Sequence, residues 1–442
     1  MMYLLGVLLI AVGIAASIAL HEIGHLVPAK KFGVKCTQYM VGFGPTIWSR
    51  RKGETEYGLK AIPLGGYVRM IGMFPPRSQD GGRLRASSTG RWSQMTEQVR
   101  AESLEEIGPG DQDRVFYKLP IWQRVVIMLG GPVMNLIIAT VLLTGIITLY
   151  GLPEITPRLS GVAQCAPADV TAAEDCTGQE DSPALAAGLQ AGDRILSVDG
   201  TAVSAWGETS YAIQNAGEQA EFVVERDGTQ QTLVADLVTR ERPLLLPTGE
   251  PELDAAGAPV IGEVGYLGAS GSIEYIAQPI TEAPAFVGTA LVETAKIFLK
   301  LPEKLVGVYQ AAFGTADRDV EGPMSVVGVG RMGGEVASGD LGMLVDSFGA
   351  RMVLLLSLLA SLNIALFVFN MVPLLPLDGG HIAGALWEGV KKTWALVLGR
   401  PDPGPVDIAK ALPVAYSVAI GLIAMTLLLV YADLVNPIRL GG

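Results

Sequence analysis

Four long stretches without a charged residue constrain what this chain of 442 residues can fold into. They cover residues 1–20, 125–151, 352–377 and 412–432. Each reaches the roughly 20 apolar residues that a helix needs to cross a hydrocarbon core about 30 Å thick. Because lipid offers no partners for backbone N–H and C=O groups, each span is expected to be a helix. With flanking residues included, the predicted helices cover 1–27, 124–151, 350–380 and 412–432. The sequence therefore predicts a polytopic α-helical membrane protein with four transmembrane helices.

The distribution of Lys and Arg predicts how these spans are oriented. No basic residue precedes the first span, and Lys30 and Lys31 follow it, which is the reverse of a cleavable signal peptide. The positive-inside rule places the base-rich segment 28–123 in the cytoplasm. Four crossings then leave 152–350 and both termini outside, and the 381–411 loop inside. The outside segment supplies much of the net charge of −12, which suits a solvated domain and argues against nucleic acid as a partner.

The three cysteines are sorted by this orientation. Cys165 and Cys176 fall in the segment predicted to lie outside, where oxidation is permitted. They form either a disulfide or two unpaired thiols. Cys36 falls on the reducing side without a partner. The chain has no Cys-x-x-Cys pair, which excludes a zinc site built on thiolates.

Three further elements are predicted between the spans. A β-hairpin is expected over 54–70, where strand formers flank an LGG turn. A β-rich module is expected over 160–240, with a short helix, an AGD turn, a strand and a tight DG turn in succession. Residues 284–305 alternate apolar and charged side chains and predict an amphipathic helix. This helix lies either at the membrane interface or against the β-rich module.

The sequence HEIGH at the end of the first span indicates a metal site. His21 and His25 are four residues apart, so on a helix they stand one above the other. Both imidazoles can then reach one Zn²⁺, with Glu22 beside it as a general base. Polar residues at the edge of an apolar span are costly unless they serve a function. The alternative is that these side chains simply meet lipid headgroups.

A third ligand is predicted at the end of the third span. A catalytic zinc needs three protein ligands and one open position. The next histidine after His25 is His381, about 350 residues later, whereas Asp378 closes an otherwise uncharged segment. The first and third spans end on the same side of the membrane, so the topology brings Asp378 to the depth of the two histidines. His381 is expected to support the site without binding the metal, because a fourth protein ligand would close it.

These motifs together resemble the site-2 proteases, which are intramembrane zinc metalloproteases. The resemblance rests on HExxH in the first span and, in the third span, on an N-x-x-P motif that begins at Asn370 and is followed by LDGG. Three further motifs are similar to those of RseP-type members: VGFGP (41–45), IPLGGYV (62–68) and GGPVMN (130–135). The β-rich module over 160–240 resembles a bacterial PDZ domain, which RseP-type members also carry. The closing ADLVNPIRL and the two-residue gap between Pro373 and Pro376 resemble actinobacterial members.

The resemblance implies specific roles. His21, His25 and Asp378 would bind zinc, and Glu22 would be the catalytic base. Asn370 would orient the substrate or steady the oxyanion, unless it only bonds between helices. The hairpin edge would pair with an unwound stretch of substrate. The substrate would be a single-pass protein of a bacterial plasma membrane, such as an anti-sigma factor already shortened by another protease, with the PDZ-like module as a size filter or tail reader.

Two other functions are compatible with parts of the sequence. A membrane-tethered PDZ adaptor with a vestigial metal site would be expected to have a damaged HExxH motif or no Asp378, and both are intact. A zinc transporter would need metal-binding side chains in several spans, and the second and fourth spans contain no His, Asp or Glu. The sequence therefore favours a protease.

Overall fold

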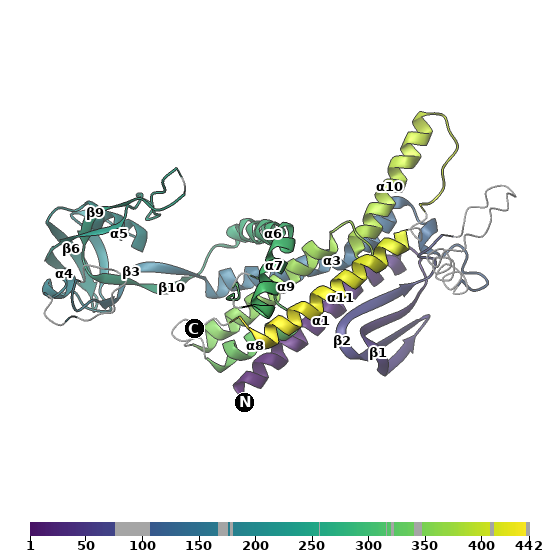
Figure 1. Cartoon of the computed structure of the whole chain (residues 1–442), viewed down its shortest axis with the longest axis horizontal. Helices are drawn as coiled ribbons and strands as arrows, with labels where there is room; N and C mark the ends of the chain where they lie inside the picture. Colours follow the sequence, from purple (N-terminus) through teal and green to yellow (C-terminus); the bar gives the residue numbers. More distant parts are fainter. Residues whose placement is uncertain are drawn as a thin grey trace. The chain divides into compact units, whose positions relative to one another are not determined.

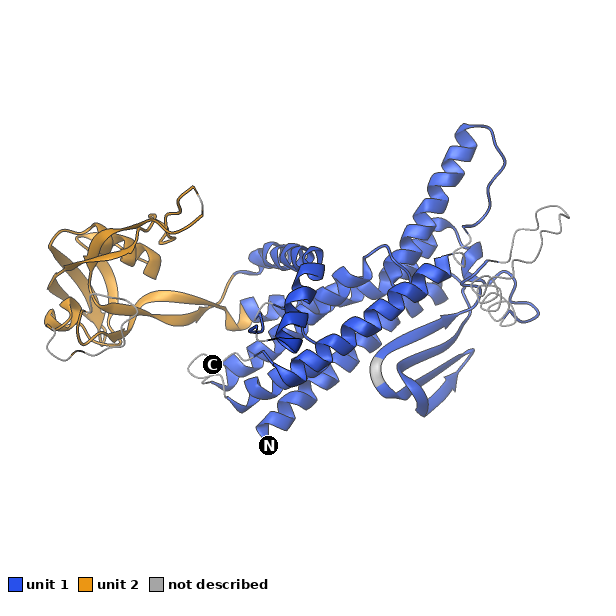
Figure 2. Cartoon of the chain, viewed as in Figure 1, with its two compact units in different colours: residues 1–147, 279–442 blue, residues 148–278 orange. Residues whose placement is uncertain are grey.

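A computed structural model describes residues 1–75, 107–166, 176, 180–255, 257–314, 316–319, 322–339, 347–406 and 411–438. The chain divides into two compact units (Figure 2). Unit 1 consists of Met1–Ile147 and Pro279–Gly442, and unit 2 consists of Thr148–Gln278. Residues 76–106 of the predicted cytoplasmic loop lie outside the described residues.

Within the described residues, four helices are long and apolar enough to cross a membrane (Figure 1). They are α1 (Met2–Lys31), α3 (Ile121–Gly145) with its π-helical continuation η2 (Ile146–Tyr150), α9 (Phe348–Asn370) and α11 (Leu412–Val435). In α11, the side chains of Ile420, Ile423 and Leu427 are each at least 60% exposed. Exposing this apolar surface to water costs free energy, whereas contact with lipid does not. The prediction of a multi-pass membrane protein with four apolar helices is confirmed.

Glycine brings α1 and α3 into direct backbone contact. A Cβ atom on Gly24 would lie 2.1 Å from the carbonyl oxygen of Gly130, and one on Gly130 would lie 1.9 Å from that of Gly24. No other residue fits at either position. Small residues allow this close approach between membrane helices, where packing and not apolar burial drives association. As a result, the HEIGH end of α1 is held against the first half of α3.

The turn after α9 leads into α10 (Asp378–Val397), a helix that the sequence analysis did not predict within the 381–411 segment between the third and fourth spans. The helix buries one side, through Ile382, Ala385, Glu388 and Ala395 at intervals of three to seven residues. Arg124 of α3 donates two hydrogen bonds to Glu388, at 3.0 and 2.7 Å, and both side chains are buried. The distribution of charged residues did not predict this helix, because its charged residue Glu388 faces inward and pairs with Arg124.

A sheet of two long strands follows α1. β1 (Cys36–Lys52) and β2 (Thr55–Met70) pair with each other, yet the two halves of β2 lie on opposite sides of β1: Gln38 pairs with both Glu56 and Arg69. The hairpin predicted within 54–70 is therefore wrong in its pairing, although strands do occur there. β1 lies between its two arms. The sequence did not predict this strand, because VGFGP within it contains two glycines and a proline.

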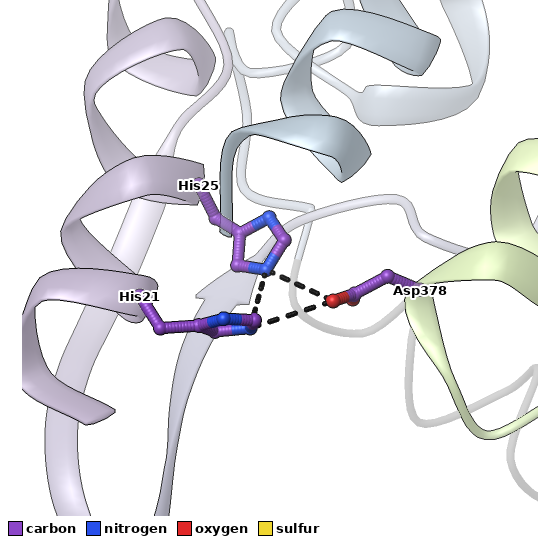
Figure 3. A group of neighbouring side chains, drawn as sticks. All are labelled: His21, His25 and Asp378. Atoms are coloured by element: carbon purple, nitrogen blue, oxygen red, sulfur yellow. Dashed lines mark hydrogen bonds and ion pairs between the residues drawn. The ribbon is translucent and has the colours of Figure 1, made fainter. Parts of the chain in front are cut away.

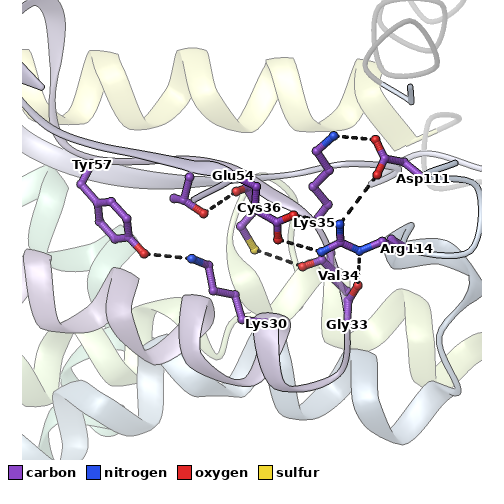
Figure 4. Close-up of polar contacts among 10 residues, drawn as sticks. Lys30, Gly33, Val34, Lys35, Cys36, Glu54, Tyr57, Asp111 and Arg114 are labelled. Atoms are coloured by element: carbon purple, nitrogen blue, oxygen red, sulfur yellow. Dashed lines mark hydrogen bonds and ion pairs between the residues drawn. The ribbon is translucent and has the colours of Figure 1, made fainter. Parts of the chain in front are cut away.

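Polar contacts fix this sheet to the end of α1 (Figure 4). Lys30 donates a hydrogen bond to the hydroxyl of Tyr57 at 2.9 Å. Arg114 donates two hydrogen bonds to Glu54 in the turn between the strands, at 2.8 and 2.7 Å. Cys36 is buried beneath them, and burial raises the pKa of its thiol to about 11. Cys36 is therefore a protonated core residue at neutral pH.

The amphipathic helix predicted over 284–305 is two helices in the structure. α6 (Ala283–Leu299) and α7 (Leu301–Phe313) meet at Lys300. Pro302 lacks a backbone N–H and is tolerated only in the first turn of a helix, so it begins a new one. The apolar face of α6 packs on α3 and α9, through Val287. The remaining elements of unit 1 are η1 (Phe116–Lys118), η3 (Ile280–Glu282) and α8 (Val326–Ser338).

Unit 2 is a β-rich domain with its own core. Its main sheet has the order β10-β3-β4-β6-β7 and is antiparallel throughout. These strands are β3 (Leu152–Val162), β4 (Arg194–Val198), β6 (Gln219–Arg226), β7 (Thr229–Asp236) and β10 (Ala269–Ile276). The other elements are β5 (Thr201–Ala202), β8 (Val238–Pro243), β9 (Ile261–Tyr266), α4 (Pro183–Ala186) and α5 (Trp206–Asn215). Phe222, Ile195 and Leu189 are at the centre of the apolar core.

A disulfide and an ion pair connect separate segments of this unit. Cys165 and Cys176 form a disulfide, which settles the alternative left by the sequence. Asp193 of the AGD turn is buried and accepts hydrogen bonds from Arg226 of β6, at 2.7 Å from Nε and 2.7 Å from Nη2. The expected helix, turn and strand succession in this segment is observed, and it belongs to a unit that extends beyond 160–240 on both sides.

Candidate metal centre

The two histidines of HEIGH lie on successive turns of α1, and their Nε2 atoms point toward each other. Their Nε2 atoms are 3.2 Å apart, and the rings meet edge to face. Asp378, the first residue of α10, places Oδ2 3.4 Å from Nε2 of both His21 and His25 (Figure 3). Among the described residues, these three form the one group of His, Cys, Asp or Glu side chains with metal-ligand spacing.

The three donor atoms fit a zinc ion. Tetrahedral zinc with bonds of about 2.0–2.2 Å requires its ligand atoms to be about 3.3–3.6 Å apart. The distances of 3.2, 3.4 and 3.4 Å agree with this value. Two imidazoles and one carboxylate are also the donor set of many catalytic zinc sites, and they leave one position open.

Space for the ion is supplied by Gly131 of α3. A Cβ atom at this position would lie 2.2 Å from Nε2 of His25 and 2.6 Å from Nε2 of His21. A side chain here would collide with the metal-binding edges of both rings. The glycine therefore leaves free space, the cradle, beside the Nε2 atoms of both histidines.

The far sides of both rings are held by α3. Nδ1 of His25 donates a hydrogen bond to the backbone carbonyl of Ile127 at 2.8 Å. Nδ1 of His21 lies 3.1 Å from the side-chain amide of Asn135, which is 1% exposed. The sequence analysis noted GGPVMN only as a motif and missed both partners. A polar residue within an uncharged span was the available signal for Asn135.

Glu22 and Asn370 occupy different positions relative to this group. Glu22 faces β2, where a Cβ atom on Gly66 would lie 2.8 Å from its Cγ, and its titratable neighbours are His25, His21 and Asp378. Asn370 is the last residue of α9 and is joined to Asp378 by the turn before α10. His381 lies in the first turn of α10 but outside the three-residue group.

Comparisons with known proteins agree with this chemistry. The family described as peptidase family M50 matches residues 9–395. Zinc metalloprotease Rip1 of Mycobacterium bovis is 37% identical over the whole of both chains, and its namesake in Mycolicibacterium smegmatis is 35% identical over the same extent. Metalloprotease MmpA of Caulobacter vibrioides is 26% identical over 85% of this chain and 84% of its own.

Together the four apolar helices and these relatives define a membrane zinc metalloprotease. The chain belongs to peptidase family M50, the site-2 proteases, with zinc as its cofactor. The resemblance stated from the sequence motifs, including that to actinobacterial members, is confirmed.

Proposed function

We propose that this zinc metalloprotease hydrolyses a peptide bond in or near the transmembrane segment of a single-pass membrane protein. His21, His25 and Asp378 bind the metal, and Glu22 is the general base. The convergence of three donor atoms on one another at the end of an apolar helix, with free space left by Gly131 beside two of them, is the observation that supports this most directly. Such a site delivers hydrolytic chemistry to the edge of the bilayer.

The residues around the site divide the reaction between them. Zinc, when bound, polarises the scissile carbonyl and makes an attacking water more acidic. Glu22 accepts the proton of that water and passes it to the departing amide nitrogen. Asn370 donates its side-chain N–H to the substrate carbonyl as negative charge develops there.

Substrate is presented by the outer edge of β2. A peptide bond inside a helix is internally hydrogen-bonded, so the substrate must unwind before it is cut. The segment 66–70 pairs with β1 on one side, and within the described residues no strand covers its other side. Gly66, at the start of this edge, lies against Glu22. An unwound substrate added as a strand would therefore pass the catalytic base.

The position of the basic segments supports a substrate that is cut near the cytoplasmic face. By the positive-inside rule, 28–123 and 381–411 are cytoplasmic and unit 2 is outside. The helix, AGD turn and strand order of unit 2 supports a PDZ-like domain, which excludes bulky ectodomains and admits shortened stubs. An anti-sigma factor trimmed by a first protease is a substrate of this class.

Comparative membrane proteomics of cells that express the wild type or Glu22→Gln tests the proposal. The amide cannot accept a proton but hardly changes the shape of the site, so the variant should bind zinc normally and lose cleavage. Shortened single-pass proteins should accumulate only in the variant. Asp378→Ala is the matched comparison, because it should lose the metal itself. Cleavage near the wild-type rate in Glu22→Gln would assign the base to another residue.

A further inference from the structure

Two contacts from the same helix lie behind the zinc-binding edges of the histidine rings. Ile127 and Asn135 are about two turns apart on α3, and each faces the Nδ1 atom of one ring. Both Nε2 atoms face Asp378 on the opposite side. A neutral imidazole has one N–H and one lone pair, so whatever binds Nδ1 decides whether Nε2 can bind a metal.

The contact at His25 leaves only one arrangement. A carbonyl oxygen can accept but not donate, so Nδ1 of His25 carries the proton in its 2.8 Å bond to Ile127. Its Nε2 atom then has a free lone pair directed toward the cradle. The backbone of α3 therefore holds His25 ready to bind zinc.

The contact at His21 allows two arrangements, because a side-chain amide has both a donor and an acceptor. With the NH₂ group toward the ring at 3.1 Å, Nδ1 of His21 must accept, which places the proton on Nε2. A protonated Nε2 cannot bind a metal. In this arrangement Oδ1 of Asn135 is buried and has no hydrogen-bond partner among the described residues.

A half-turn of the Asn135 amide about its last bond changes which nitrogen of His21 carries the proton. The two terminal atoms exchange places with little change in shape. Oδ1 then accepts a hydrogen bond from Nδ1–H of His21, which frees the Nε2 lone pair for the metal. The NH₂ group takes the former position of Oδ1, so one amide atom is unpaired in either arrangement, and the need for a free Nε2 lone pair selects this one when zinc binds.

We propose that Asn135 is a positioning residue of the metal centre. In the zinc-loaded protein its Oδ1 accepts the Nδ1–H of His21, as the Ile127 carbonyl does for His25. This inference rests on the proposed role of His21 as a ligand. Partners that orient a metal-binding histidine typically change metal affinity about 10–100-fold.

The test compares zinc affinity in Asn135→Leu and Asn135→Asp by chelator competition, on the full-length protein in detergent. Leucine keeps the size but removes the acceptor, and zinc should bind about 10–100-fold more weakly. Aspartate keeps the acceptor, and affinity should stay near that of the wild type. A purely structural role predicts the opposite order, because leucine suits packing between apolar helices better than a carboxylate does.

Asn363→Leu is the matched control. Asn363 is also a buried asparagine in a span, and it bonds Ser17 of α1 at 2.9 Å without touching either histidine. Its variant should keep wild-type zinc affinity whatever it costs in stability. If Asn135→Leu does not fold, Asn135→Ala carries the same expectation.

Two results would overturn the inference: wild-type affinity in Asn135→Leu, or equal weakening in Asn135→Leu and Asn135→Asp. His21→Ala separates this failure from that of the proposed function. If His21→Ala loses zinc while Asn135→Leu retains it, only the role of Asn135 is wrong. If His21→Ala itself retains zinc at wild-type affinity, the ligand assignment fails.

Discussion

The two units of this protein bury polar side chains for different purposes. In unit 1, His25, Asn135 and the Arg124–Glu388 pair are buried between helices that are otherwise apolar, and each contacts the metal centre or the helix that carries Asp378. In unit 2, the buried Asp193 ties a turn to a neighbouring strand. At these residues, polar burial supports a site in unit 1 and the fold in unit 2. Changes at these positions of unit 1 should therefore alter zinc binding, and a change at Asp193 of unit 2 should alter stability alone.

The largest expected effect is at Gly131. In Gly131→Ala the new methyl group collides with the metal-binding edges of both histidines, so zinc affinity should fall by more than the roughly 100-fold typical of losing a residue that only orients a ligand. Metal content of the purified protein measures this. Gly145→Ala, on the same helix with no atom within 4 Å of its Cβ, is the control and should keep its zinc. Normal metal content in Gly131→Ala would show that the cradle is not the zinc site.

The Arg124–Glu388 pair should show the next largest effect. Removing one partner leaves a buried charge without compensation, at a cost of about 3–5 kcal/mol. Glu388→Gln should therefore lower the thermal stability of the full chain and speed hydrogen exchange in α10. Zinc affinity should fall with it, because α10 begins at the ligand Asp378. The double variant Arg124→Met/Glu388→Met should recover much of the stability; no recovery would mean that the charges themselves are required.

The disulfide of unit 2 provides the contrasting measurement. Cys165→Ser/Cys176→Ser opens a short loop whose ends are 11 residues apart, which should cost about 3 kcal/mol. Hydrogen exchange should accelerate in the strands of unit 2 and remain unchanged in α1, α3 and α10. Zinc content should not change. Loss of zinc in this variant would contradict the separation of the two units.

A smaller effect is expected from acid on unit 2. Burial raises the pKa of Asp193, but the hydrogen bonds from Arg226 and from the backbone N–H of Gln190, together with the charge of Arg226, outweigh it and hold the pKa below its ordinary value. A carboxyl group whose pKa is lower in the folded protein stabilises it above the unfolded pKa of about 3.9. That contribution is lost as pH falls through the folded pKa. Hydrogen-exchange protection around β4, relative to the intrinsic exchange rate at each pH, should therefore fall below about pH 4, and Asp193→Asn should show lower protection already at neutral pH with a weaker acid response.

The sequence predicted the parts of the site that follow from local spacing and topology. The spacing of four positions from His21 to His25 defines one helix face, and two spans ending on the same side bring Asp378 to it. The structure places these three side chains together. Gly131 and Asn135 could not be assigned in this way, because their roles depend on the crossing of α1 and α3. A contact between residues 21 and 135 has no periodic signal along the chain.

The same limit explains the errors in the fold. The apolar spans were found because their physical requirement is local and continuous. The pairing of β2 with both sides of β1 depends on which distant segments meet, and neighbouring strand formers favoured a local hairpin instead. The buried role of Glu388 was missed because its partner, Arg124, is 264 positions away in the sequence.

The space left by Gly131 has a consequence for other chains that carry HExxH and the distant aspartate. Such a chain can retain every ligand and still be unable to hold zinc if the residue aligned with Gly131 has a side chain. Ligand motifs alone would then count it as an active enzyme. One position on a helix that donates no ligand can thus separate active proteases from inactive, pseudoenzyme members.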